Sequence, residues 1–189
     1  MMNDYSIREL TDEQFGPLFS QHVGAVFESV HDYSFDDLLD DTERVHIDRL
    51  SRRLGSPWTL RLGAFDREDR FVGWTWGRQE SRHAFYMVNS GVLAGHRRRG
   101  LYTALIDRCV SAAFDEGFQL VYSRHCATNN AVIIPKLKAG FVISTLGIDD
   151  RHGVLVHLHR YANADRHRIM DYRSGQRGPD AGIRKLFGL

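Results

Sequence analysis

The chain lacks several features that would assign a protein to a class at once. It has two cysteines in 189 residues, Cys109 and Cys126, too few for a disulfide scaffold and without the paired spacing of a zinc site. No apolar run approaches the roughly 18 residues that span a bilayer. The first residues lack a basic region followed by an apolar stretch, so we expect no secretory signal. These absences favour a cytoplasmic protein with no metal and no membrane contact.

The chain also has almost no net charge. Its 25 lysines and arginines balance 24 acidic residues, giving a formal charge of +1. Such a chain has no general attraction to nucleic acid or to acidic lipid, so we expect neither as a partner. The hydrophobic fraction of 42% and the charged fraction of 26% are ordinary for a globular protein. The length suits one domain with a short extension.

A basic loop between two apolar segments is the most informative feature that is present. An apolar run ends at Arg97-Arg98-Arg99-Gly100, and Leu101, Ala104, Leu105 and Cys109 then recur at helical spacing. The N–H groups at a helix start lack intrahelical partners and lie at the positive end of the helix dipole, so this loop can hold an anion. Gly100 would let the backbone approach a diphosphate closely. The loop matches neither the GK[ST] nor the G-x-G-x-x-G phosphate motif.

A second motif follows at a distance of one helix and one strand. Asn129 opens an apolar segment that ends in Gly140-Phe141, where Gly140 suits a left-handed helix cap and Phe141 can begin a strand in the core. Together the two motifs resemble the GNAT superfamily of N-acetyltransferases over about residues 5–161. The resemblance implies an α/β fold in the order βααβββαβαββ, with a mixed sheet that splays in the middle and helices on both faces. Residues 1–161 would form this domain, and residues 162–189 an extension.

Periodicity and turn residues give the expected elements. We expect strands at 5–10, 59–65, 71–77, 84–93 and 118–123, and a late hairpin of 141–148 with 154–161. A capping box at Thr11 begins a helix whose apolar spacing continues to Val30. A second helix, capped by Ser34, should run to Leu54.

The resemblance also implies an activity and its site. The protein would transfer an acetyl group from acetyl-CoA to a primary amine of a small molecule or peptide, by direct attack in a ternary complex. A bulge in the strand before the loop, marked by Gly91, would expose the N–H group that polarises the thioester carbonyl. Pantetheine would pair with the end of that strand and with Asn129, and pyrophosphate would lie on the loop. The implied cofactor-binding residues are Val92, Leu93, Ala94, Arg97, Arg98, Arg99, Gly100, Leu101, Tyr102, Thr103 and Asn129.

The chain departs from the family pattern at three positions. Tyr102 stands where the loop usually has Gly or Ala, so its side chain must turn away from the phosphates or pack along the cofactor. Ala94 stands where many members have proline. Lys136 stands where many members have the tyrosine that protonates the leaving thiolate, so that role does not carry over and we expect water or another residue to supply the proton. Pro135 would disturb its helix outside the first turn.

The acid–base residues and the acceptor are less well specified. Tyr86, His83 and Glu80 are the candidate bases, although a surface or packing role suits His83 better. Arg124, where some members have glutamate, could bind a carboxylate of the acceptor or form a structural ion pair.

The sequence allows two alternative functions and one further partner. The missing tyrosine leaves room for a non-catalytic acyl-CoA-binding module, and the three arginines for a nucleic-acid-binding domain, which the neutral overall charge opposes. Apolar residues near Ile169 and Ile183 predict two short helices in the extension. These would pack on the domain or on a second copy in a homodimer.

Overall fold

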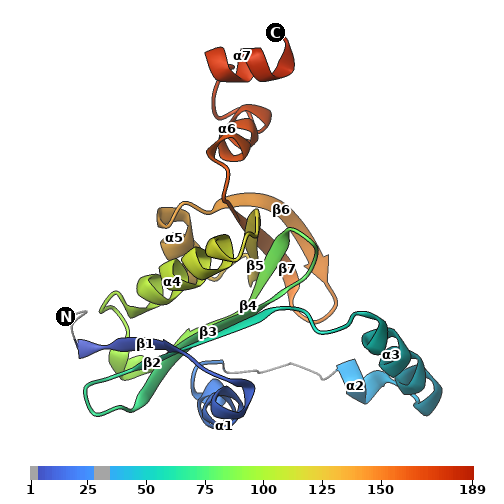
Figure 1. The fold of residues 1–189 in the computed structure, drawn as a ribbon, viewed down its shortest axis with the longest axis vertical. Coiled ribbons are helices and arrows are strands. Elements are labelled where there is room, and N and C mark those ends of the chain that lie inside the picture. Colours follow the sequence, from blue (N-terminus) through green and yellow to red (C-terminus); the bar gives the residue numbers. More distant parts are fainter. Residues whose placement is uncertain (1–3, 28–34) are drawn as a thin grey trace.

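A computed structural model describes residues 4–27 and 35–189 and places seven strands in one mixed sheet of order β1-β2-β3-β4-β5-β7-β6 (Figure 1). The strands are β1 (Ser6–Glu9), β2 (Thr59–Phe65), β3 (Phe71–Gln79), β4 (Ala84–Val92), β5 (Leu120–Cys126), β6 (Val142–Asp149) and β7 (Gly153–Tyr161). The helices are α1 (Asp12–His22), α2 (Phe35–Leu38), α3 (Asp41–Arg53), α4 (Leu101–Asp115), α5 (Asn130–Lys138), α6 (Ala164–Arg173) and α7 (Ala181–Phe187), with short 3-10 turns η2 (Val23–Ala25) and η3 (Ala94–His96).

Helices cover both faces of this sheet, as predicted (Figure 1). On one face α4 packs across β2, β3, β4 and β5, and its Leu105, Ile106 and Cys109 are fully buried. On the other face α1 packs Phe15 against an aromatic cluster that includes Trp74. The predicted fold class and element order are confirmed, with the second helix divided in two and two further helices at the end.

The sheet opens between its fourth and fifth strands. β4 and β5 run parallel and pair only from Ala84–Leu120 to Tyr86–Tyr122, after which they separate. We call this opening the fork. It is the splayed centre that the sequence predicts. Within it, the facing edges of β4 and β5 are not paired with each other and can bind a ligand.

The bulge in β4 lies at Val88 and not at Gly91, which corrects the sequence prediction. Asn89 pairs with Trp76 and Met87 with Gly77, so Val88 has no partner on β3. Gly91 is glycine for another reason. A Cβ there would lie 2.7 Å from the Trp74 ring, so the residue makes room for the indole.

The second predicted helix is wrong in its continuity, although α2 begins at Phe35, directly after the predicted cap. The chain forms α2 and α3 separately, and Asp40 begins α3 with a capping box that includes Glu43, which interrupts the helix between them. Ser34 and Val30 lie outside the described residues, and α1 already ends at His22. The apolar residues of α3 are exposed, including Val45 at 65%, so their spacing did not indicate a buried face.

The prediction that Pro135 would disturb its helix is also wrong. Pro135 is the sixth residue of α5, and the helix continues past it because only one intrahelical hydrogen bond is lost. Bonds from Ala139 N–H to the Pro135 carbonyl and from Phe141 N–H to the Lys136 carbonyl close the last turn. Gly140 has φ +82° and Phe141 is buried, as the second motif predicts.

The C-terminal extension forms two helices at one end of the molecule (Figure 1). Arg166 of α6 lies over the Tyr161 ring, 4.6 Å from its centre, and Met170 packs beside it. α7 packs on α6 through buried Ile183 and a contact between Tyr172 and Phe187. The two predicted helices are confirmed, whereas a contact with a second copy stays a prediction.

Candidate active site

The basic loop has the backbone shape of an anion cradle. After the turn η3, Arg98 has φ +60° and Gly100 has φ +82°, and both are left-handed conformations. The first hydrogen bond of α4 runs from Ala104 N–H to the Gly100 carbonyl, so the N–H groups of the three residues between them have no acceptor within the helix. A left-handed arginine is strained by about 1–3 kcal/mol, and such strain concentrates at functional sites. The loop therefore presents free N–H groups to an anion.

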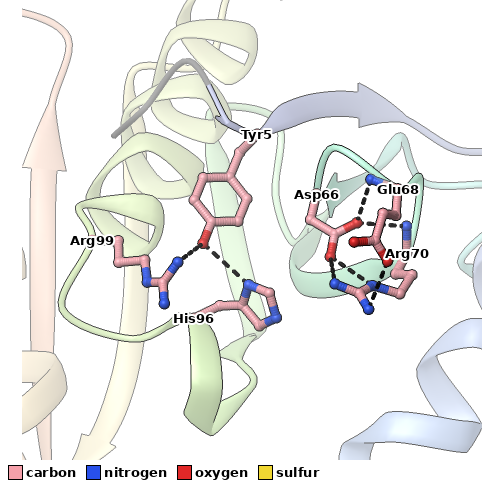
Figure 2. Close-up of polar contacts among 6 residues, drawn as sticks. All are labelled: Tyr5, Asp66, Glu68, Arg70, His96 and Arg99. Atoms are coloured by element: carbon pink, nitrogen blue, oxygen red, sulfur yellow. Dashed lines mark hydrogen bonds and ion pairs between the residues drawn. The ribbon is translucent and has the colours of Figure 1, made fainter.

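A residue near the N-terminus, Tyr5, forms hydrogen bonds with this loop. The hydroxyl of Tyr5 lies 3.1 Å from Nδ1 of His96 and accepts a hydrogen bond from Arg99 (Figure 2). Figure 2 also shows the neighbouring turn, where Arg70 bonds Asp66. Within the loop, Nε of Arg97 donates to the Val92 carbonyl at 2.9 Å. Sequence reasoning missed Tyr5 and His96, because no local pattern links residues 91 positions apart.

The end of β4 offers only part of its edge to a ligand. Leu93 N–H donates to the Val72 carbonyl of β3, so strand alternation directs the N–H and carbonyl of Val92 toward the open side. The Val92 carbonyl already accepts from Arg97. Asn129, at the start of α5, does not cap its helix with its side chain. Of the predicted pantetheine-binding groups, the N–H of Val92 faces the open side of β4. The contact with pantetheine itself stays a prediction.

Tyr102 and Thr103 point in different directions from the first turn of α4. Tyr102 packs against the main core, where its hydroxyl is buried without a hydrogen-bond partner and burial raises its pKa. The sequence left two orientations for this side chain, and the structure shows the one that turns away from the loop and into the core. Thr103 lines a groove of about 700 Å³ between α4 and α5, with Lys138 and Arg160 on its wall.

Glu80, Tyr86 and Arg124 come together on the face of the fork opposite α4. Arg124 lies over the rings of Tyr86 and Tyr122, with distances of 5.0 and 5.7 Å to the ring centres, and forms an ion pair with Glu80 at 3.4 Å. Burial raises the pKa of Tyr86. His83 does not join them. It precedes β4, at the end where β4 and β5 are still paired, and its side chain is exposed.

The α4 face of the fork holds a buried polar chain that the sequence did not predict. Nζ of Lys136 donates to Oγ of Ser123 at 2.7 Å and lies 3.7 Å from Sδ of Met87. Oγ of Ser123 is also 2.9 Å from Nε2 of His125. Burial lowers the pKa of Lys136 from 10.5 to about 7 and, together with the lysine, that of His125 from 6.5 to about 3. The only signal in the sequence was a lysine in an apolar helix.

Two further observations concern metal ligands and membrane-spanning helices. Among residues 4–27 and 35–189, no three His, Cys, Asp or Glu side chains gather as a metal site would require. Within the same ranges, no helix has the length and apolar character needed to cross a membrane.

Comparison with known proteins adds a family and a set of similar folds. Residues 9–141 match the Acetyltransferase (GNAT) family. A search of curated proteins gives no significant match.

Three solved structures illustrate the likeness, all below 20% identity, so they speak for the fold alone. The structure of yncA from Salmonella typhimurium with its cofactor acetyl-CoA has 16% identity and a TM-score of 0.61, covering 85% of this chain and 95% of that one. The ribosomal-protein-S18-alanine N-acetyltransferase of Escherichia coli has 14% identity and a TM-score of 0.61, covering 83% and 93%. The dodecameric spermidine N-acetyltransferase of Vibrio cholerae has 12% identity and a TM-score of 0.59, covering 84% and 94%.

Proposed function

We propose, from the premise that the chain belongs to the acetyltransferase (GNAT) family, that it transfers an acetyl group from acetyl-CoA to a primary amine of a small molecule or peptide. The amine would attack the thioester directly in a ternary complex. Residues 1–161 would be the catalytic domain and residues 162–189 an extension. The single observation that carries the proposal is the loop after β4: its first three helical N–H groups have no acceptor within α4, and it follows the strand that parts from β5 at the fork.

The loop and the fork suit two parts of the same cofactor. A pyrophosphate on the N–H groups of Leu101, Tyr102 and Thr103 would meet the positive end of α4. From there the fork allows an extended pantetheine arm to pair with the N–H of Val92, as an added strand would, and with the Asn129 amide. Arg98, beside this loop, is exposed and adds positive charge.

The acceptor would approach from the face that carries Tyr86 and Arg124. Two similar folds act on different amines by their names, one on an alanine of a ribosomal protein and one on spermidine. The arginine already has a carboxylate partner in Glu80, at a loose 3.4 Å. A guanidinium with five donors can hold a second carboxylate, so we propose an amino acid or peptide with an acidic group in preference to a polyamine.

Substitution of Gly100 tests the cofactor site. Gly100→Val should weaken acetyl-CoA binding about 100-fold or more, because valine resists the left-handed conformation and its side chain blocks close approach to the loop. Gly95→Val is the matched control, since an added Cβ at Gly95 meets nothing within 4 Å. Isothermal calorimetry with acetyl-CoA provides the measurement, and a thermal melt checks that both variants fold. Equal affinities in the two variants would remove the loop from the site.

A turnover screen tests the chemistry separately. Release of free CoA from acetyl-CoA would be followed with amino acids, a peptide with a free N-terminus, spermidine and an aminoglycoside. Turnover with at least one amine supports the transferase. Tight acetyl-CoA binding with no turnover across the screen would favour the alternative, a non-catalytic acyl-CoA-binding module.

A further inference from the structure

One amine bridges the two strands at the point where they part. The last paired residues of the fork are Tyr86 and Tyr122, so Met87 and Ser123 are the first residues on each strand beyond the pairing. Nζ of Lys136 contacts both of them, at 3.7 Å to the Met87 sulfur and 2.7 Å to the Ser123 hydroxyl. Lys136 therefore lies across the apex of the fork, on the α4 side.

This position is costly for a lysine. Its side chain is 1% exposed, and the Ser123 hydroxyl is the one oxygen that accepts from its three N–H donors among the described residues. The ring face of Phe141, 5.1 Å away, offers a weaker contact. A methionine or leucine would fill the same space without a charge to desolvate. A packing role alone does not account for an amine here.

A hydrogen-bonded chain connects the amine to the outer end of β5. Ser123 is fully buried, whereas His125, two residues further along the same strand face, is partly exposed. The titratable groups that act on Lys136 are His125 of β5 and Cys109 of α4, and burial raises the pKa of that thiol to about 12, so it stays neutral. The lysine has a pKa of about 7, so it can both give and regain a proton near neutral pH.

We propose that Lys136 is the general acid of acetyl transfer and that Ser123 and His125 return a proton to it. The proposal rests on the proposed function, since it needs a thioester in the fork. As the acceptor nitrogen bonds to the acetyl carbon, the carbon–sulfur bond breaks and the sulfur takes a proton from Nζ of Lys136. The acceptor nitrogen releases its own proton to water. The neutral amine then regains a proton from water through His125 and the Ser123 hydroxyl.

The tyrosines near the fork do not compete for this role. Tyr102 points into the core, and Tyr86 and Tyr122 lie on the opposite face, under the guanidinium of Arg124. The proposal takes the place of the expectation drawn from sequence, that water or another residue supplies the proton.

Lys136→Met tests the proposal with acetyl-CoA and the fastest amine of the screen. We expect kcat to fall about 100-fold, acetyl-CoA affinity by calorimetry to stay within about twofold, and the melting temperature not to fall. In the wild type, kcat should decline above about pH 7 as the amine loses its proton, and the variant should lack this limb. Lys185→Met on α7 is the control, with kcat unchanged.

A second variant separates proton donation from packing. Lys136→Tyr places at the same site a phenol whose pKa is near 10 in water and is raised further by burial. It should recover part of kcat and move the alkaline limb to about pH 10 or above. A Lys136→Met protein that keeps wild-type kcat would overturn the role of the lysine alone. A wild type that binds acetyl-CoA but acetylates no amine would overturn the proposed function, and this proposal with it.

Discussion

The two faces of β5 carry polar groups that differ in burial, all within the four residues from Tyr122 to His125. Ser123 and His125 face α4 and form a chain with Lys136, which is 1% exposed. Tyr122 and Arg124 face the other way, where the Arg124 side chain is 38% exposed beside Glu80. Strand alternation alone separates the two groups. The first face lies under helices α4 and α5, whereas on the second face Tyr122 is buried and the Arg124–Glu80 pair is exposed.

The difference in burial decides what each group can do. An exposed ion pair such as Arg124–Glu80 is screened by water and contributes about 0–1 kcal/mol to stability. A buried amine loses its hydration, which shifts its pKa toward neutrality and makes proton transfer accessible at physiological pH. β5 therefore carries an exposed guanidinium on one face, and on the other face its Ser123 contacts the buried amine of Lys136.

The largest stability effect should come from removing the buried amine. Lys136→Met should raise the free energy of unfolding at pH 7 by up to about 5 kcal/mol, from a pKa lowered from 10.5 to about 7 at about 1.4 kcal/mol per unit. The unfolded lysine binds its proton up to about pH 10.5, so wild-type stability should rise with pH between 7 and 10.5 and be constant in this term below 7. Urea unfolding at pH 7 and pH 10 measures both.

The exposed Lys138 on the same helix supplies the control. Lys138→Met should change the free energy of unfolding by less than about 0.5 kcal/mol at either pH. A Lys136→Met protein less stable than the wild type at pH 7 would mean that the amine stabilises the fold, and the comparison of the two faces would fail.

A smaller effect should follow removal of the hydroxyl acceptor. Ser123→Ala leaves the ammonium of Lys136 without its buried oxygen partner and should lower stability by about 1–3 kcal/mol. In the Lys136→Met background the same change should cost much less, because no buried donor remains. A double-mutant cycle by urea unfolding measures this coupling, and additive effects would show that the hydroxyl and the amine do not depend on each other.

The smallest stability effect should come from a substitution at Arg124, on the face of β5 opposite α4. Arg124→Lys should change the free energy of unfolding by less than about 1 kcal/mol, since the pair with Glu80 is exposed. It should nevertheless raise KM for the best acceptor, because a lysine cannot reproduce a two-point contact with a carboxylate. Steady-state kinetics and calorimetry with acetyl-CoA separate the two effects. An unchanged KM would leave Arg124 with a structural role only.

Local features of the fold could be predicted because their causes lie within a few residues. The capping box at Thr11 and the glycine cap at Gly140 were correct, since each depends on short-range hydrogen bonds or backbone conformation. The second predicted helix failed because apolar spacing alone did not reveal that Asp40 would begin a new helix. The bulge was misplaced from Val88 to Gly91 because strand register depends on the partner strand.

By itself, the sequence determined the resemblance to the GNAT family, through two motifs. It also determined the loop at the start of α4 and most elements along the chain, because these follow from turn residues and local periodicity. Only the tertiary structure decided which side chains meet. Tyr5 reaches His96 across 91 residues, and Lys136 reaches Ser123 from a different element. The chemistry of Lys136 depends on exclusion of water by helices α4 and α5 and by both strands of the fork. The burial of this amine is a property of the assembled molecule, since the local sequence shows only a lysine in an apolar helix.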